Sequence, residues 1–152
     1  MTEQTWILTG SPENFDKTRE LGFTLIGLKE HRHRQALEIA EGDRIVFYLT
    51  RVMCFAASAR IASELWEERT PVWPGKPGDA DAYPWRFQLE PELELEQSDW
   101  LPAESLVDEL DHIRKWPREH WKLAFQGQLR AVSQSDSELL LERMTSAGAV
   151  SA

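Results

Sequence analysis

Hydrophobic and polar positions along the chain fall into short blocks, and each block predicts one element of secondary structure. Five apolar runs, bounded by glycine, proline or charged residues, have the length and composition of β-strands. They cover residues 5–9, 23–28, 44–50, 52–62 and 85–96, and residues 129–132 add a short sixth strand. The run 52–62 is rich in alanine and would also suit a helix, but its position directly after another strand favours a hairpin.

The run 85–96 alternates between apolar and polar residues, which predicts a strand with one buried and one solvated face. The apolar face consists of Trp85, Phe87, Leu89, Leu93 and Leu95. Arg86 and the glutamates that follow it lie on the polar face. Pro91 interrupts the apolar register, and because proline cannot donate to a sheet ladder, it predicts an edge strand or a bulge at this point.

Helix signals occur once near the N-terminus and repeatedly after residue 100. Ser11 and Pro12 are the residue types expected at an N-cap and a first turn, and Gly22 is a natural end for that helix. Three later helices are predicted to begin at Pro102, Pro117 and Ser135. The second of them brings Trp121 and Phe125 within reach of the core.

These elements together predict an α+β fold, with a strongly curved, mostly antiparallel sheet of about five or six strands and flanking helices. We expect one domain over residues 1–146 and a frayed tail over 147–152. No apolar run approaches the roughly 20 residues of a membrane span. The single Cys54 excludes an intramolecular disulfide and a cysteine-based zinc site, and the N-terminus lacks a secretory signal, so we expect a cytoplasmic protein.

The net charge of −9 is concentrated in one region of the chain. Nine of the 26 acidic residues lie between Arg86 and Arg114, a stretch without lysine or arginine. The rest of the chain holds 17 acids and 17 bases, so a basic surface patch is compatible with the overall acidity. The negative total argues against indiscriminate binding of nucleic acids, because that affinity comes mainly from phosphate neutralisation.

The stretch Pro71–Phe87 is the strongest candidate for a binding site. It holds two Trp, a Tyr, a Phe and four Pro in seventeen residues, and its Pro-Gly steps predict a loop over residues 71–82. An ordered loop rich in aromatic rings, with a cation nearby in Arg86, suits a flat ligand with polar edges. Trp73, which lies among prolines, is the expected pocket wall. Arg86 has an alternative role as an ion-pair partner of the acidic stretch that follows it.

A second candidate surface is the dense basic cluster KEHRHR at residues 29–34. Its cationic and imidazole side chains are Lys29, His31, Arg32, His33 and Arg34. They either contact a phosphate backbone or form the solvated start of a short helix. The two histidines would need further ligands to hold a metal, so we expect no metal site. Tyr48 lies on a buried strand, and its hydroxyl requires a partner from a ligand or from a backbone carbonyl.

In its motifs the chain resembles the EVE domain family, which has the PUA-like fold and is related to the YTH readers of methylated adenine. The resemblance is carried by TWILTGSPENF at 5–15, EGDRIVFYLT at 41–50, PVWP at 71–74, YPWRF at 83–87 and HWKLAFQGQLR at 120–130. These motifs occur in the family's order and span nearly the whole chain. The fold that the resemblance implies is a small, open β-barrel decorated by helices.

The resemblance also implies a function, because family members bind modified bases in DNA or RNA through an aromatic pocket at the barrel mouth. Carried over by motif, it implies pocket roles for Trp73, Tyr83 and Arg86. Ser11 and Asn14 lie in the loop that borders the pocket in relatives. The other expected pocket residues are Tyr48, Ile26, Gly27 and Lys29, and the expected backbone contacts are Arg32, Arg34, His31 and His33.

One position departs from the family pattern. Many relatives carry a Trp just before the glycine that here is Gly27, whereas this chain has Ile26. Where that Trp is the second wall of the cage, the corresponding wall here is aliphatic. The resemblance therefore leaves open methylated adenine, another modified base or another small aromatic ligand. It also leaves open a nuclease partner encoded separately.

Catalytic motifs give little support for an enzyme. The sequence contains no Gly-x-Ser-x-Gly elbow, no phosphate-cradling glycine loop and no His-Glu-x-x-His. We therefore expect a binding module without catalytic residues or a cofactor. One alternative is a hydrolase of acylated nucleosides like some ASCH domains, in which Lys29 would act with Glu30 or Glu41. Another alternative is a protein-interaction module that uses the acidic face of residues 90–111.

Overall fold

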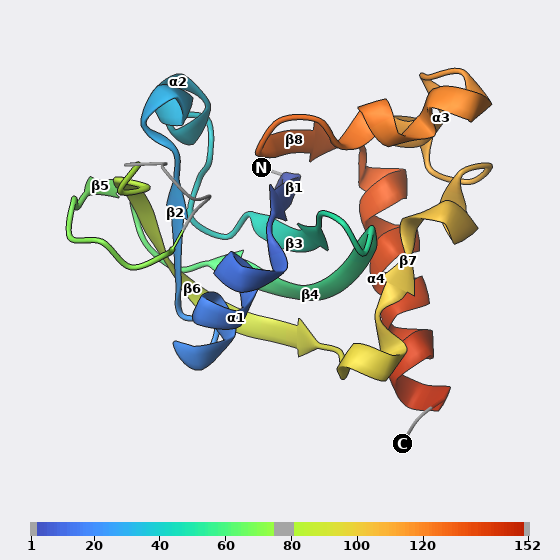
Figure 1. Ribbon diagram of the computed structural model, residues 1–152, viewed down its shortest axis with the longest axis horizontal. Helices are drawn as coiled ribbons and strands as arrows, with labels where there is room; N and C mark the ends of the chain where they lie inside the picture. Colours follow the sequence, from blue (N-terminus) through green and yellow to red (C-terminus); the bar gives the residue numbers. More distant parts are fainter. Residues whose placement is uncertain (1–2, 75–80, 151–152) are drawn as a thin grey trace.

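The computed structural model describes residues 3–74 and 81–150. Six strands form a curled half-barrel in the order β2-β6-β4-β3-β1-β8, and the short strands β5 and β7 pair with β6 and β4 (Figure 1). The strands are β1 (Thr5–Gly10), β2 (Leu25–Leu28), β3 (Arg44–Leu49), β4 (Cys54–Ile61), β5 (Trp66–Glu67), β6 (Trp85–Glu94), β7 (Leu101–Pro102) and β8 (Leu129–Val132). In the described part of the chain β1 and β3 pair in parallel and the other pairings are antiparallel, which confirms the predicted fold class.

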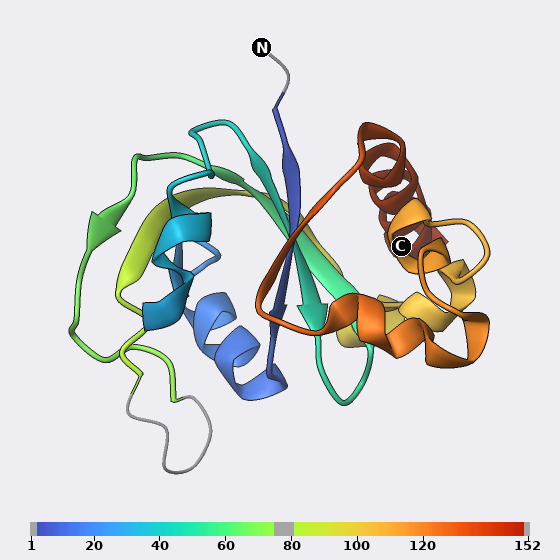
Figure 2. The same cartoon turned by 90° about the horizontal axis from the view of Figure 1, so that it is seen from above.

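Helices cover both faces of the sheet. The α-helices are α1 (Pro12–Glu20), α2 (His33–Ala36), α3 (Asp111–Arg114) and α4 (Gln134–Val150), and the 3-10 helices are η1 (Glu30–Arg32), η2 (Gln97–Asp99), η3 (Ala103–Leu106) and η4 (Arg118–Phe125). In Figure 2, α1 and α2 lie within the curl of the sheet, whereas α3, η4 and α4 lie on its other side. Among the described residues, no helix has the length and apolar character that crossing a bilayer requires.

The two faces of the sheet support two hydrophobic clusters. Along β3, Ile45 and Phe47 pack into the cluster on the α1 side, whereas Val46 and Tyr48 pack into the cluster on the α4 side. Because side chains alternate along a strand, a sheet covered on both faces has strands that are apolar throughout. This explains why β3 forms an uninterrupted apolar run in the sequence.

The structure corrects the predicted faces of β6. Trp85, Phe87 and Leu89 pack into the α1-side cluster as predicted, but Leu95 packs on the α4 side. The cause is a bulge at Glu92, where the pairing with β4 shifts its register. One extra residue in a strand moves all later side chains to the opposite face. The bulge that Pro91 predicts is therefore present, and its effect on the alternation is larger than expected.

The C-terminal region also differs in detail from the sequence prediction. The helix predicted from Pro102 is broken into η3 and α3, because the carboxylate of Asp136 accepts hydrogen bonds from the backbone N–H groups of Asp111 and His112 and so starts a new helix there. The hydroxyl that accepts from Asp136 N belongs to Ser133 and not to Ser135. Helix α4 continues to Val150, so the described part of the expected tail is helical.

Candidate functional site

A cavity of about 40 Å³ lies where β1 and β3 end and α1 begins. Its lining consists of Leu8, Thr9, Gly10, Ser11, Asn14, Phe15, Thr18, Ile26, Gly27, Phe47, Tyr48, Leu49, Trp73, Tyr83 and Gln128. A larger groove of about 370 Å³ shares part of this lining and adds Lys29, His31, Arg32, Thr50, Phe125, Gln126 and Gly127. The cavity therefore has aromatic and aliphatic walls, and its mouth leads to a groove that carries cations.

The start of α1 supplies polar groups to the mouth of the cavity. Ser11 is the N-cap that the sequence predicts, and its hydroxyl accepts a hydrogen bond from Asn14 N at 3.1 Å. The cap holds Asn14 on the first turn, from which its side-chain amide donates to the Tyr83 hydroxyl at 3.1 Å. Ser11 and Asn14 thus meet Tyr83, which is far from them in the sequence.

Trp73 is a wall of the cavity and is itself buried, with 8% of its surface exposed. Its indole Nε1 donates to Thr18 Oγ1 at 2.9 Å, and its ring meets Tyr83 edge-on with the centroids 5.9 Å apart. A Cβ atom on Gly27 would lie 2.5 Å from Cζ3 of Trp73 and 2.6 Å from the Tyr83 carbonyl oxygen. Only glycine therefore fits at position 27, which is the close backbone approach that its place within a strand predicts.

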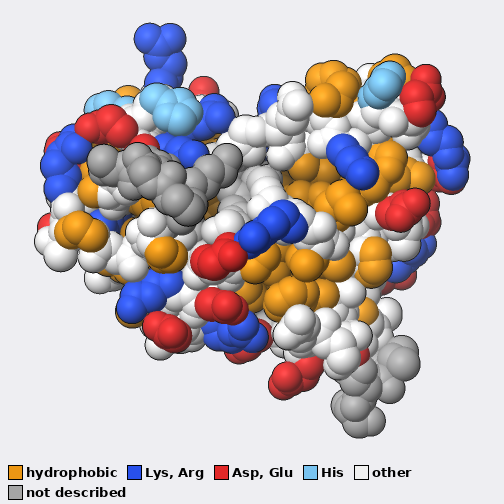
Figure 3. All heavy atoms as spheres, viewed as in Figure 1, with side chains coloured by type: hydrophobic (Ala, Val, Ile, Leu, Met, Phe, Trp, Pro, Cys, Tyr) orange, Lys and Arg blue, Asp and Glu red, His pale blue; other side chains and the backbone are white. Residues whose placement is uncertain are grey.

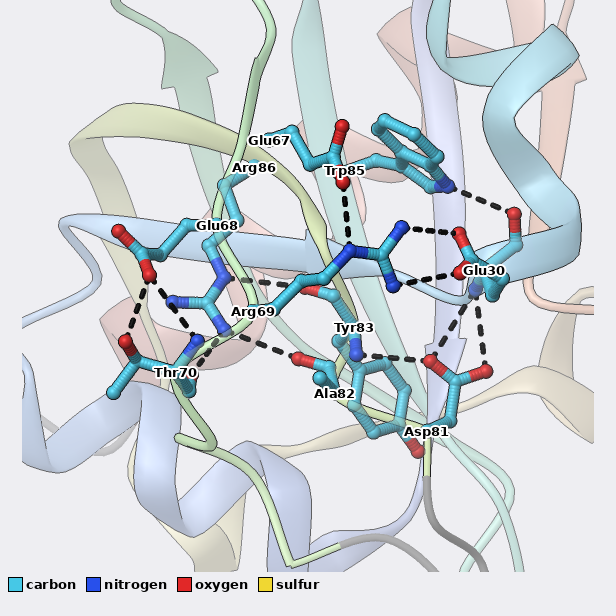
Figure 4. A network of polar contacts seen from close by, with 10 residues as sticks. All are labelled: Glu30, Glu67, Glu68, Arg69, Thr70, Asp81, Ala82, Tyr83, Trp85 and Arg86. Atoms are coloured by element: carbon cyan, nitrogen blue, oxygen red, sulfur yellow. Dashed lines mark hydrogen bonds and ion pairs between the residues drawn. The ribbon is translucent and has the colours of Figure 1, made fainter.

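Arg86 holds the aromatic loop in place from inside the protein (Figure 4). Only 2% of its surface is exposed, and its guanidinium donates to the carbonyl oxygens of Tyr83, Thr70 and Ala82 at 3.1, 2.5 and 3.0 Å. The same group lies 5.2 Å from the ring centroid of Trp73. Burial lowers the pKa of Arg86 from its ordinary value, and the charge of Glu68 opposes that shift.

The position of Arg86 corrects the prediction of a solvated polar face. The side chain does lie on the face opposite Phe87, but β5 and residues 68–74 and 81–84 cover that face. The guanidinium bonds to backbone carbonyls on both sides of residues 75–80, which lie outside the described part of the chain. An ion pair with the acidic stretch after β6 is therefore not the role of Arg86.

A second set of contacts fixes the loop from its outer side (Figure 4). The carboxylate of Asp81 accepts from Glu30 N at 3.2 Å, and the Glu30 carboxylate accepts from Arg69 at 2.7 and 3.1 Å. Trp85 Nε1 donates to the carbonyl oxygen of Glu30 at 2.8 Å. Arg69, Asp81 and Trp85 are thereby tied to η1, the helix that follows the groove residue Lys29.

One buried hydroxyl group beside the cavity lacks a partner within the described residues. Thr9 Oγ1 makes no hydrogen bond to a described residue. The ring of its neighbour Tyr48 packs in the α4-side cluster, where it stacks on Phe125. Thr9 and Tyr48 are direct neighbours across the parallel strands β1 and β3. Burial raises the pKa of Tyr48, so its hydroxyl stays protonated and can donate a hydrogen bond at any physiological pH. Buried polar groups in native proteins bond to protein, ordered water or ligand, so the Thr9 hydroxyl is available to a molecule in the cavity.

Gln128 joins the two ends of the open sheet beside the cavity. Its side-chain oxygen accepts from Lys29 N at 2.9 Å, and its side-chain nitrogen lies 3.5 Å from the carbonyl oxygen of Gly27. The end strand β8 begins at the next residue, and the other end strand is β2. Sequence reasoning missed Thr9 and Gln128 as site residues. Both residues lie in motifs that carry the family resemblance, Thr9 near the end of β1 and Gln128 directly before β8.

The structure divides the basic cluster into two groups. Lys29, His31 and Arg32 line the groove, and the Arg32 guanidinium lies against Gly127, whose φ of +85° turns the chain there. His33 instead stacks on Trp85 with the ring centroids 3.9 Å apart, and Arg34 is exposed outside the groove lining. The first three residues are therefore brought together with the cavity, and the last two are not.

The carboxylates considered for a hydrolase do not face the groove. Glu30 is held by Arg69, and neither Glu30 nor Glu41 is among the residues that line the cavity or the groove. In the described part of the chain, the lining of both spaces contains no Asp or Glu at all. No group of three or more metal-ligating side chains occurs among the described residues.

The fold is shared with solved structures of very different sequence. A hypothetical protein from Leishmania major is 14% identical with a TM-score of 0.65, and the match covers 95% of this chain and 96% of that one. The YTH domain of the MRB1 protein from Zygosaccharomyces rouxii, solved in complex with N6-methyladenosine RNA, is 15% identical with a TM-score of 0.65, over 93% and 86% of the two chains. A protein from Rhodopseudomonas palustris is 13% identical with a TM-score of 0.59, over 93% of each chain.

Sequence comparison identifies the family directly. No curated protein shows significant sequence similarity to the chain. The family model described as the EVE domain, however, matches residues 4–143, which include every strand of the half-barrel and most of α4. This range contains the cavity, the groove and the loop that Arg86 holds. The chain belongs to the EVE domain family.

Proposed function

We propose that the protein is a non-enzymatic module that binds a modified nucleobase in single-stranded or locally opened nucleic acid. The observation that carries the proposal is a cavity walled by Trp73 and Tyr83 whose mouth leads to a groove lined by Lys29, His31 and Arg32. Aromatic rings bind bases by stacking, and cations bind the phosphates that position the strand. A base must leave the duplex to enter such a cavity, which favours unpaired targets.

The charge distribution at the site supports a polyanionic ligand. The chain has a net charge of −9, but the described lining of the cavity and of the groove contains no carboxylate. A phosphate backbone can therefore approach without crossing a negatively charged rim. The same lining gives Lys29 no carboxylate partner, which favours a binding role over the hydrolase alternative.

The polarity of the cavity lining points to the part of the base that it holds. Ser11 and Asn14 place polar groups at its mouth. The walls away from the mouth are apolar and include Phe15, Ile26 and Phe47. We infer that a small apolar substituent of the base enters this end, while the ring lies at the mouth near Tyr83 and Trp73. The aliphatic wall at Ile26 suits an alkyl group and offers no second ring for stacking.

The likeness to a YTH domain supports the same reading. That neighbour was solved with N6-methyladenosine RNA, and its fold matches over 93% of this chain. We extend the general function, reading a modified base, to this protein because its cavity has aromatic walls and the adjoining groove has cations. We do not extend the identity of the base, since Ile26 departs from the family's Trp.

The proposal is tested by binding of labelled single-stranded oligonucleotides, followed by fluorescence anisotropy. The panel contains N6-methyladenine, 5-methylcytosine, N4-acetylcytosine or no modification in an otherwise identical sequence. We expect at least tenfold tighter binding of one modified oligonucleotide than of its unmodified counterpart, without turnover of the acetylated one. Equal affinities across the panel would contradict the proposal, and release of acetate would favour the hydrolase.

A cavity variant with a matched control links this binding to the site. Asn14→Ala removes a polar group at the mouth and is expected to weaken binding about tenfold, the effect of one hydrogen bond. Asp16→Ala lies on the exposed side of the same helix and should leave the affinity unchanged. Trp73→Ala is a poorer choice, because losing this buried indole is expected to cost about 3–5 kcal/mol of stability.

A further inference from the structure

The segment 114–122, which leads from the end of α3 into η4, combines cations and tryptophans on the surface. It contains four Lys or Arg residues, one Glu, one His and two Trp, within a chain whose net charge is −9. The cations are Arg114, Lys115, Arg118 and Lys122. Trp121 packs against the α4-side cluster but is only partly buried, and Trp116 is 36% exposed. The composition of this segment therefore suits contact with nucleic acid. The segment lies outside the lining of the cavity, so binding of a base there does not account for it.

A second groove, of about 550 Å³, runs beside this segment. Its lining consists of Met53, Glu104, Val107, Arg118, Glu119, Trp121 and Lys122. Figure 3 shows hydrophobic side chains gathered on the face over β4 and β7, with Lys, Arg and His side chains on the neighbouring α3 side. Arg118 pairs with Asp108, whereas Lys122 has no ion-pair partner among the described residues. The groove thus offers a partly exposed indole next to an available cation.

The second groove continues the line of the first. Each groove has the β3–β4 turn on one side, with Thr50 lining the first groove and Met53 lining the second. The other side of each groove is formed by η4 or by the residues that follow it. Aromatic rings connect them. Tyr48, a residue of the cavity lining, stacks on Phe125 with the ring centroids 4.1 Å apart. Phe125 in turn meets Trp121 edge-on with the ring centroids 6.3 Å apart. Phe125 therefore contacts both the cavity residue Tyr48 and the groove residue Trp121.

We infer that Trp121 is a stacking platform for an unpaired base that neighbours the base in the cavity. This inference rests on the proposed function and extends its footprint along the strand. Lys122 holds the adjoining phosphate, and the carboxylates of Glu104 and Glu119 keep the backbone on the Lys122 side of the groove. An aromatic platform beside a cation is how sequence-independent contacts to single strands are made. The excess of positive charge in residues 114–122 favours this ligand over an apolar protein segment.

The experiment compares a free modified nucleoside with a five-nucleotide strand that carries the same base at its centre. The modification is the one that the parent protein binds in the panel above. Trp121→Leu keeps an apolar side chain against Phe125, so the fold should be retained, and thermal unfolding checks this. We expect it to weaken binding of the pentanucleotide by about tenfold or more, and to change the affinity for the nucleoside less than twofold.

Further variants separate a stacking role from a packing role. Trp121→Phe keeps an aromatic face and should restore most of the pentanucleotide affinity, while Trp116→Leu, outside the groove lining, should have no effect. If Trp121→Leu lowers the affinities for nucleoside and pentanucleotide equally, or changes neither, Trp121 is not a stacking platform. The proposed function would be unaffected by that result. If the parent binds pentanucleotide and nucleoside equally well, the platform is likewise excluded. Absence of binding to every member of the panel would overturn both ideas. Binding of a protein segment that Trp121→Leu abolishes, with the pentanucleotide unaffected, would assign the groove to a protein partner.

Discussion

At the scale of single residues, Thr9 holds a buried hydroxyl group that the described protein leaves without a hydrogen-bond partner. Leaving a buried polar group unpaired costs on the order of 1–3 kcal/mol, so this group reduces the stability of the free protein. A ligand that offers a hydrogen-bonding edge would recover that cost on binding. We therefore expect the Thr9 hydroxyl to serve recognition.

Removing the Thr9 hydroxyl is expected to have opposite effects on stability and on binding. Thr9→Val keeps the shape of the side chain and removes the unpaired hydroxyl, so the free energy of unfolding should stay the same or rise by about 1 kcal/mol. Affinity for the modified oligonucleotide should fall about tenfold. Urea unfolding and anisotropy on the same preparations measure the two quantities.

Thr24→Val is the matched control for Thr9→Val. Its hydroxyl is bonded to the carbonyl oxygen of Leu21 at 2.6 Å and lies outside the cavity. Its loss should lower stability slightly and leave binding unchanged, the reverse of the pattern at Thr9. A loss of stability in Thr9→Val without a loss of affinity would show that the hydroxyl serves the fold and not the ligand.

At the scale of elements, β6 shows how far local pattern determines structure. Its existence, its apolar residues and the bulge near Pro91 could all be predicted, because they depend on neighbouring residues. The burial of Arg86 could not be, because it depends on segments 66–74 and 81–84 folding over that face. Thr9 was missed for a similar reason, since only the alignment of β1 with β3 places it beside Tyr48.

The bulge in β6 also predicts a pH dependence of stability. Burial alone would raise the pKa of Glu92, but hydrogen bonds from Arg44, Ser58 and Arg60 lower it from 4.5 to about 2. The folded protein thus favours the ionised form, so this contribution is present above about pH 4.5 and is lost as the pH falls toward 2. Glu92→Gln should lower the free energy of unfolding by about 1–3 kcal/mol at pH 7.

Urea unfolding of the parent and of Glu92→Gln at pH 7, 5 and 3 tests this expectation. The difference between the two proteins should be nearly constant from pH 7 to 5 and should shrink at pH 3. Glu90→Gln, at an exposed position on the same strand, is the control and should follow the parent at each pH. A difference that does not change with pH would mean that packing, and not charge, gives Glu92 its effect.

At the scale of the whole molecule, the negative charge is separated from the proposed binding site. The nine acids between Arg86 and Arg114 are absent from the described lining of the cavity and of its groove. The sequence alone revealed that the acidity is regional, because it required only counting. It could not reveal which members of the cluster at 29–34 face the ligand, since η1 and α2 turn Arg32 into the groove and Arg34 away from it.

This separation predicts a salt dependence that belongs to particular residues. Each phosphate contact on a single strand contributes about 0.7 to the slope of log affinity against log salt concentration. Lys29→Gln and Arg32→Gln should each reduce the magnitude of the slope by about 0.7, while Arg34→Gln removes the same charge from outside the groove and should leave it unchanged. Anisotropy titrations between 50 and 300 mM salt, at about five concentrations, resolve this difference. Equal changes in all three variants would mean that the ligand responds to the net charge of the protein, whereas a change in the two groove variants alone requires that phosphates lie in the groove next to the cavity.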